Sequence, residues 1–240
     1  MWKTLLRTDI SRIWLNAWGS KVRFAYGLSK AKNQWNIIHL WGWIYKIRTC
    51  DTSPMSDISV EYWDIVALLI REHSPSGAII AHEKSLELSF RNFEPPEKLV
   101  LYTRNTSKRV RILSYEFHFR TLRSGPKTKG RNMFPIFLDH AFTIDIDSHT
   151  FHTLWIEAAL LDVASLKIHD EGVSEELLIK SIKKYEKTYS RKILWELVAY
   201  RYIRAMNRIR SIAKEHGYSL LYEYSLDIIK KEWGGCFVAF

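Results

Sequence analysis

The sequence has little cysteine and no long apolar run, and both shortages restrict what the chain can be. Only two of its 240 residues are cysteines. Cys50 and Cys236 lie far apart, and neither belongs to a recognisable metal-binding or thiol-enzyme motif, so we expect no disulfide framework and a reducing cytoplasm as the compartment. The longest uninterrupted apolar stretch is residues 65–70, whereas a membrane-spanning helix needs about 20 such residues. We therefore expect no membrane partner.

Sequence signatures of catalysis are also missing. The chain contains no Gly-x-Ser-x-Gly, no P-loop and no Gly-x-Gly-x-x-Gly, which are the motifs of common hydrolase and nucleotide sites. His140, His149 and His152 lie close in sequence but lack the cysteines or the glutamate-flanked pattern of a zinc site. We expect no cofactor and no bound metal ion, and our leading interpretation is a protein that is not an enzyme.

Acidic residues are nearly absent from the first fifty positions. Asp9 stands there alone against nine lysines and arginines, so this segment carries +8 of a total formal charge of +10. Such a block attracts polyanions and makes contacts that release counterions from nucleic acid. The block lacks the long amphipathic stripe of a membrane-surface helix, and we therefore expect nucleic acid as the partner.

The local patterns in this segment predict a small helical unit followed by a strand. Helices are predicted over 12–18, 21–26 and 30–40, and a strand over 43–48, because capping residues and glycines separate stretches of helical and mixed periodicity. Three helices followed by a hairpin-like strand match the order of a winged helix-turn-helix. We place this domain at residues 1–54 and a second domain at 55–240, where the charge changes sign.

The predicted DNA contacts are polar residues on the third helix and basic residues around it. Lysine reaches guanine or phosphate, and asparagine bonds adenine, so this helix face suits a major groove, while the wing would lie against phosphates. A solvated helix face is the alternative interpretation. The candidate DNA-binding residues are Arg23, Lys30, Lys32, Asn33, Asn36, Lys46 and Arg48.

The second domain is predicted to be α+β, with a small, mostly antiparallel sheet and a helical C-terminal part. Helices are expected from about 60 to 73 and over 78–90, and further helices follow at 152–167, 174–188, 190–214 and 219–232. Strand composition marks 98–103, 109–113, 115–122 and 141–146. A basic loop is predicted at 123–131.

Two further groups of charged residues could carry chemistry. Asp145 and Asp147 are two residues apart on a predicted strand, which would suit magnesium binding in a nuclease or nucleotidyltransferase; a turn with an acidic pair is the competing interpretation. Arg201, Arg204 and Arg208 form one stripe on the helix at 190–214, so they could contact phosphates or an acidic partner, or simply face solvent.

Three stretches resemble the antitoxins of the abortive-infection E type. Residues 35–48 read WNIIHLWGWIYKIR and look like the family's third helix entering the wing. Residues 78–88 are similar to the helix that opens the second domain. Residues 157–162 read EAALLD and look like the family's Glu-Arg-Ala-Leu-Leu-Asp helix, with Ala158 where an arginine is common.

This resemblance implies a winged-helix repressor that binds operator DNA of its own toxin–antitoxin operon. It also implies that the second domain counteracts a nucleotidyltransferase-like toxin without needing a stable complex with it, as in type IV systems. A homodimer on the operator would fit paired half-sites. Besides the enzyme that would use Asp145 and Asp147, a protein-interaction module with incidental DNA binding remains an alternative.

Overall fold

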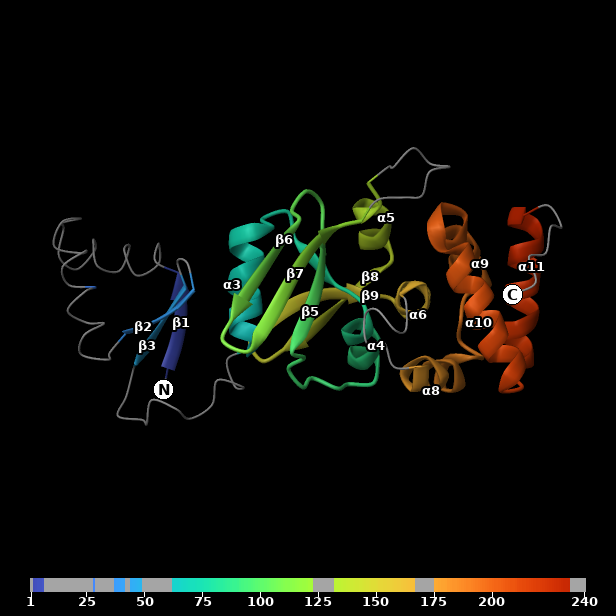
Figure 1. Ribbon diagram of the computed structural model, residues 1–240, viewed down its shortest axis with the longest axis horizontal. Coiled ribbons are helices and arrows are strands. Elements are labelled where there is room, and N and C mark those ends of the chain that lie inside the picture. Colours follow the sequence, from blue (N-terminus) through green and yellow to red (C-terminus); the bar gives the residue numbers. More distant parts are fainter. Residues whose placement is uncertain are drawn as a thin grey trace.

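The computed structural model confirms an α+β protein (Figure 1). It describes residues 2–6, 28, 37–41, 44–48, 62–122, 132–166 and 175–233. The predicted domain boundary at 54/55, the helices at 12–18 and 21–26, and the basic loop 123–131 lie outside these residues. They stay predictions.

The first described unit is a three-stranded antiparallel sheet. Strands β1 (Trp2–Leu6), β2 (Ile37–Trp41) and β3 (Ile44–Arg48) are arranged in the order β1-β3-β2. The predicted strand at 43–48 is confirmed over β3. The predicted helix at 30–40 is wrong over residues 37–40, which pair with β3 in a hairpin. The neighbouring isoleucines at 37 and 38 favour a strand, and the short apolar run did not distinguish the two structures.

A six-stranded mixed sheet forms the centre of the molecule. Its strand order is β6-β7-β5-β4-β9-β8, with three antiparallel and two parallel pairings. The predicted strands at 98–103, 109–113, 115–122 and 141–146 are confirmed within a residue at each end. The strands are β4 (Ala78–Ile80), β5 (Lys98–Thr103), β6 (Lys108–Ile112), β7 (Tyr115–Thr121), β8 (Ala141–Ile146) and β9 (His149–Leu154).

Two predicted helices begin too early in the sequence. Residues 78–80 form β4, and the helix that follows, α4, covers only Glu83–Ser89. This also corrects the resemblance at 78–88, where a helix was expected throughout. Residues 152–154 belong to β9, and α6 runs over Ile156–Ser165. In both places a strand leads into a helix within two residues, so local periodicity does not separate the two elements.

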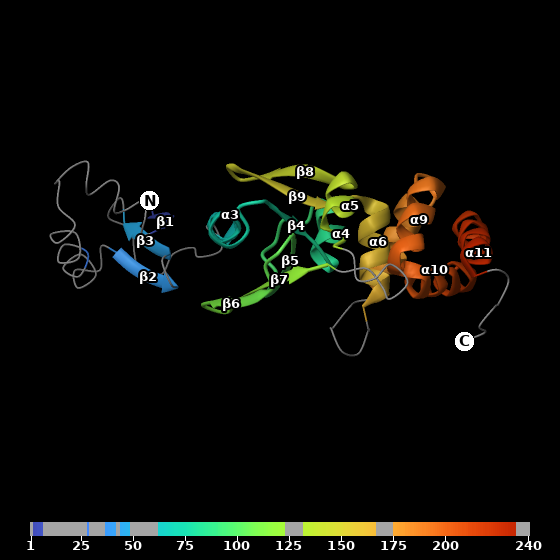
Figure 2. The same ribbon diagram turned by 90° about the horizontal axis from the view of Figure 1, so that it is seen from above.

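Helices cover both faces of this sheet, as Figure 2 shows with α3 on one side and α4 and α6 on the other. Helix α3 (Tyr62–His73), predicted from its apolar face, packs with Ala78, Ile80 and Leu101 in one buried cluster. Helices α4 and α6, with α5 (Phe134–Asp139), pack with Ile79 and Val100 in a second cluster. Alternate residues of β4 and β5 therefore enter different cores.

The C-terminal part is helical, as predicted, and packs on α6. It consists of α8 (Glu175–Tyr185), α9 (Arg191–Leu197), a π-helical segment η3 (Val198–Tyr202), α10 (Ile203–Glu215) and α11 (Ser219–Trp233). In Figure 1 these helices lie at the end of the molecule farthest from the N-terminal sheet. None of the helices in the described ranges has the length and apolar character needed to cross a membrane.

Candidate functional site

The structure places two of the seven predicted DNA contacts. Lys46 and Arg48 both lie in β3, the strand that pairs with β2 on one side and β1 on the other. Alternate positions of a strand share a face, so these two positions fall on the same face of the hairpin. The other five predicted contacts, Arg23, Lys30, Lys32, Asn33 and Asn36, lie outside the described residues.

Asp145 and Asp147 do not form a carboxylate cluster. Asp145 is exposed in β8, and its Oδ1 accepts a hydrogen bond from Thr150 Oγ1 at 2.6 Å. Asp147 occupies the turn between β8 and β9, with a φ of 54°. Among the described residues, no group of three or more histidine, cysteine, aspartate or glutamate side chains could hold a metal ion. The geometry favours the interpretation of this pair as part of a turn.

The three neighbouring histidines are spread over separate contacts. His149 Nε2 lies 2.5 Å from Asp64 Oδ1 and links β9 to α3. His140 Nε2 lies 3.6 Å from Glu196 Oε2 on α9, and His152 is exposed. Each of the two paired histidines therefore connects secondary-structure elements across the fold.

The predicted arginine stripe is not one surface. Arg204 is exposed, but Arg208 turns toward α6, where its Nη1 donates to the carbonyl oxygens of Ala164 at 3.3 Å and Leu166 at 2.8 Å. These are orphan carbonyls of a helix C-terminus. Burial lowers the pKa of the Arg208 guanidinium. Arg208 is therefore a structural cap rather than a free phosphate contact, which corrects its place in the stripe. The side chain of Arg201 lies outside the described residues.

Helix α6 carries a buried acidic group that residue-type reasoning alone did not find. Asp162 Oδ1 accepts hydrogen bonds from Tyr102 at 2.6 Å and from Tyr202 at 3.2 Å, and Oδ2 accepts from the backbone amide of His82 at 3.0 Å. His82 has a φ of 58°, a backbone conformation that is strained for a residue with a side chain. One carboxylate thus joins α6 to β5, to the start of α4 and to η3.

A second buried carboxylate lies at the other end of the same helix. Glu157 Oε1 accepts a hydrogen bond from the backbone amide of Ser190 at 2.6 Å, at the start of α9. Ala158 beside it is fully buried. Residues 157–162 therefore supply the two buried carboxylates around which the C-terminal helices pack. In the sequence, only the family resemblance of this stretch pointed to these residues.

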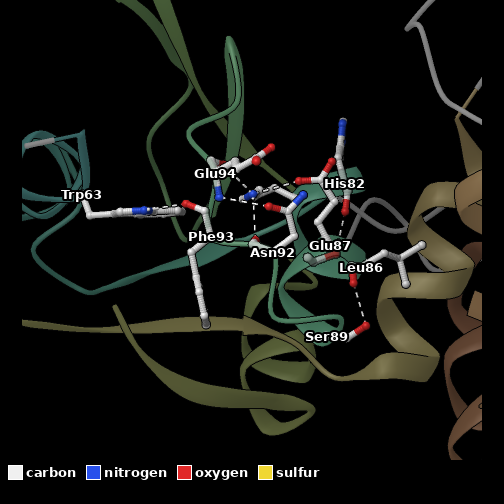
Figure 3. Close-up of polar contacts among 10 residues, drawn as sticks. Trp63, His82, Leu86, Glu87, Ser89, Asn92, Phe93 and Glu94 are labelled. Carbon is white, nitrogen blue, oxygen red and sulfur yellow. Dashed lines mark hydrogen bonds and ion pairs between the residues drawn. The ribbon is translucent and has the colours of Figure 1, made fainter. Parts of the chain in front are cut away.

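A buried lysine fixes the loop after α4. Lys84 Nζ donates to Glu87 Oε2 at 2.8 Å and to the carbonyl oxygens of Asn92 at 3.0 Å and Glu94 at 2.6 Å. From the other side, Trp63 Nε1 donates to the carbonyl oxygen of Phe93 at 3.1 Å, as Figure 3 shows. The loop is therefore held against both α4 and α3.

This loop borders a cavity of about 580 Å³ between the end of α4, strand β8 and the start of α6. Its walls include Leu88, Phe142 and Trp155, and its charged groups are Arg91 and Asp145. A mostly apolar lining with few charges is typical of a pocket that holds a small apolar group. Arg91 and Asp145 add one charge of each sign to this lining.

Comparisons with known proteins identify a similarity of fold. No protein-family model matches the chain, and a search of curated proteins finds no match. Among solved structures, the chain is similar to the crystal structure of the RV2827C protein from Mycobacterium tuberculosis, with a TM-score of 0.59 and 12% sequence identity. The match covers 95% of this chain and 76% of that one. At this identity the likeness shows a shared fold.

Proposed function

We propose that the chain is a transcriptional regulator with antitoxin activity that binds operator DNA of its own toxin–antitoxin operon. The observation that carries this proposal is an antiparallel hairpin, β2–β3, at the end of a segment with a net charge of +8. In a winged helix-turn-helix, such a hairpin is the wing that follows the recognition helix. The fifty-residue segment combines this hairpin with the charge that phosphate binding requires.

The hairpin changes the extent of the proposed recognition helix. Because β2 begins at Ile37, that helix ends before this residue. The proposed base contacts Lys30, Lys32, Asn33 and Asn36 all precede it in sequence. Arg23 remains a proposed phosphate contact beside this helix, and Lys46 and Arg48 supply phosphate contacts from the wing.

The antitoxin part of the proposal comes from the family resemblance of residues 157–162. In this chain that stretch organises the C-terminal helices around Asp162 and Glu157. We infer that this second unit counteracts a nucleotidyltransferase-like toxin without a stable complex. Co-expression of the chain with the toxin gene of the same operon is the direct test, and it should restore growth. Unrelieved toxicity would argue against antitoxin activity.

Operator binding is tested with the variant Lys46→Ser/Arg48→Ser and DNA from the promoter of the chain's own operon. Removing one phosphate contact lowers the slope of log affinity against log salt by about 0.9, so the slope for the double variant should fall by roughly two units. The decrease should be similar for operator and unrelated DNA. The matched control is Lys183→Ser/Lys187→Ser, which changes two exposed lysines of the C-terminal part. If the salt dependence of the double variant equalled that of the control, Lys46 and Arg48 would not be phosphate contacts of a wing.

Base reading is tested separately at Asn33. Asn33→Ala should change which operator sequence is preferred in a binding-site selection, because asparagine pairs with adenine in the major groove. An unchanged preference would remove Asn33 from the recognition surface while leaving the wing in place.

A further inference from the structure

The second unit carries a row of exposed arginines on its edge strand β6. Val110 and Ile112 of this strand are buried in the cluster under α3. Arg109 and Arg111 alternate with them and are exposed, so their positions face the opposite side of the sheet. An arginine pair on an edge strand also blocks strand addition from another chain, but it leaves two guanidinium groups directed at solvent.

The strand register extends this row across two more strands. Arg109 pairs with His118 of β7, and Arg111 pairs with Glu116. Glu116 in turn pairs with Lys98, the exposed first residue of β5. Arg120 follows His118 by two positions in β7 and lies on the same face. We call this surface the basic sheet face and define it by Lys98, Arg109, Arg111 and Arg120.

Positive charge is concentrated at the β6 end of the basic sheet face, where Arg109 and Arg111 are exposed. His118 is buried, and its Nε2 lies 3.1 Å from Glu116 Oε2. Burial lowers the pKa of His118, and the nearby charges of Lys98, Arg109 and Arg120 lower it further, whereas the hydrogen bond that Glu116 accepts from His118 raises it. The same hydrogen bond, followed by the charges of His118 and the β6 arginines, lowers the pKa of Glu116.

The charges of Arg111 and Arg109 act on Glu116, whereas Lys98 borders a separate pocket whose lining also includes Glu83, Glu87 and Glu97. Within the described part of the chain, Lys98, Arg109 and Arg111 form no hydrogen bond or ion pair through their side chains. Burial lowers the pKa of His118, and its buried Nδ1 has no hydrogen-bond partner among these residues. At Arg109 and Arg111 the basic sheet face thus has an excess of positive charge, which an anionic ligand would neutralise.

The basic sheet face lies at the end of the sheet nearest the N-terminal unit. Strand β6 contacts β2 of the N-terminal sheet, and Figure 2 shows β6 as the strand farthest from β8 and on the side of the N-terminal strands. Helices α4 and α6 cover the same face at its other strands. The second unit therefore presents cations next to the hairpin that the proposed function assigns to DNA.

We propose that the basic sheet face binds the sugar-phosphate backbone of the operator duplex beyond the hairpin contact. This inference rests on the proposed function and adds a second contact surface to it. The DNA-binding site would then extend over both units of the chain, with the N-terminal unit reading bases and the sheet face holding phosphates.

The spacing and chemistry of the arginines suit a duplex. Two residues along an antiparallel strand span about 6.8 Å, and every second phosphate along one DNA strand advances by about the same distance along the helix axis. Guanidinium groups bind phosphate through paired donors. A lipid surface would call for apolar residues among the cations, which the exposed positions of β6 do not provide.

The test compares Arg109→Gln/Arg111→Gln with the full-length wild-type chain on two duplexes. The short duplex covers only the footprint that depends on Lys46 and Arg48, and the long duplex extends one helical turn on each side. The wild type should bind the long duplex more tightly, by roughly tenfold or more for two extra contacts. The variant should lack this preference and show a salt slope smaller by about two units, while its affinity for the short duplex stays unchanged.

The matched control is Lys183→Gln/Lys187→Gln, which removes two exposed cations from the C-terminal part and should bind both duplexes as the wild type does. Circular dichroism and thermal unfolding establish that each variant is folded, and the single variant Arg111→Gln repeats the measurement with half the change. Hydroxyl-radical footprinting should show protection outside the hairpin site in the wild type and in the lysine control, but not in Arg109→Gln/Arg111→Gln.

Two results would overturn the inference, and they are distinguishable from failure of the proposed function. If Arg109→Gln/Arg111→Gln keeps the wild-type preference for the long duplex while Lys46→Ser/Arg48→Ser still reduces the slope, the sheet face does not hold DNA and the hairpin does. If operator binding by the arginine variant is intact but its rescue of growth from the toxin is abolished, the face serves an acidic protein partner instead. If the wild type does not bind its operator, the proposed function itself fails.

Discussion

At the residue scale, the buried carboxylate of Asp162 joins three separate parts of the fold. Its three hydrogen bonds come from Tyr102, Tyr202 and the backbone of His82. In Asp162→Asn one acceptor oxygen becomes a donor, so a buried donor is left without its partner. Such a change costs about 1–3 kcal/mol. We expect a decrease of that size in the free energy of unfolding measured with urea.

The control for this change is an exposed carboxylate in an ion pair. Asp227 pairs with Arg191 at the surface, and pairs of this kind contribute at most about 1 kcal/mol. Asp227→Asn should therefore change stability less than Asp162→Asn. Equal effects would mean that the buried carboxylate has no special role in holding α6.

His118 provides a residue-scale prediction about pH. Its pKa is lowered first by burial and then by Lys98, Arg109 and Arg120. In an NMR titration the His118 resonance should therefore shift below pH 6.5, the ordinary histidine value. Arg109→Gln should raise this pKa, because it removes a neighbouring positive charge. Glu116→Gln should lower it further, because it removes the hydrogen bond that favours the charged ring.

The sign of the stability change follows from the same shift. The unfolded chain binds a proton at His118 more readily than the folded chain, so the stability associated with the neutral ring is complete above about pH 6.5. It is lost as the pH falls through the lower folded-state pKa. An unfolding free energy that fell instead as the pH rose across this window, with wild type compared to His118→Gln, would contradict the assignment.

At the element scale, the end of α6 depends on a side chain from α10. Arg208 donates to the carbonyl oxygens of Ala164 and Leu166, whereas Arg204, one turn earlier, is exposed. Arg208→Gln leaves these carbonyls without their donor, so stability should fall by about 1–2 kcal/mol. Arg204→Gln should stay within about 0.5 kcal/mol of the wild type. Thermal or urea unfolding distinguishes the two variants. Identical unfolding midpoints would indicate that Arg204 and Arg208 both face solvent.

The secondary-structure elements also show which parts of the fold can be predicted from the sequence alone. Helices with a clear apolar face and strands between turn residues were predicted correctly, as α3 and β5 illustrate. Local periodicity predicts helix at three short stretches that form strands, because each lies beside a helical pattern: residues 37–40, 78–80 and 152–154. Their strand structure depends on partners elsewhere in the chain: Ile79 pairs with Tyr102 and with His152. Such pairings are not encoded in local periodicity.

Some features of the candidate sites can be predicted from the sequence, and others depend on the fold. The charge excess of the first fifty residues and the strand that carries Lys46 and Arg48 are visible in the sequence. The basic sheet face is not, because Lys98, Arg109, Arg111 and Arg120 come together only through the register of three strands. The direction of Arg208 toward α6 likewise depends on helix packing, so its helical spacing alone placed it with the exposed arginines.

At the scale of the whole molecule, we expect the central sheet to couple its two cores into one cooperative unit. Leu69 lies fully buried in the core under α3, and Leu161 lies fully buried in the core on the other face. The two cores share the central strands, since Ile79 enters one while Ala78 and Ile80 enter the other. Disruption of either core should therefore expose the inner face of the sheet that supports its neighbour.

We expect Leu69→Ala and Leu161→Ala each to lower stability by about 2–5 kcal/mol. Hydrogen exchange should show the coupling, because the slowest amides exchange through global unfolding. In Leu161→Ala the slowest amides of α3 should accelerate by the same factor as those of α6, and Leu69→Ala should give the reciprocal result. If each substitution accelerated only its own layer, the sheet would separate two independent units, and the phosphate contacts proposed for β6 could not be rigidly linked to the helical part that carries Asp162.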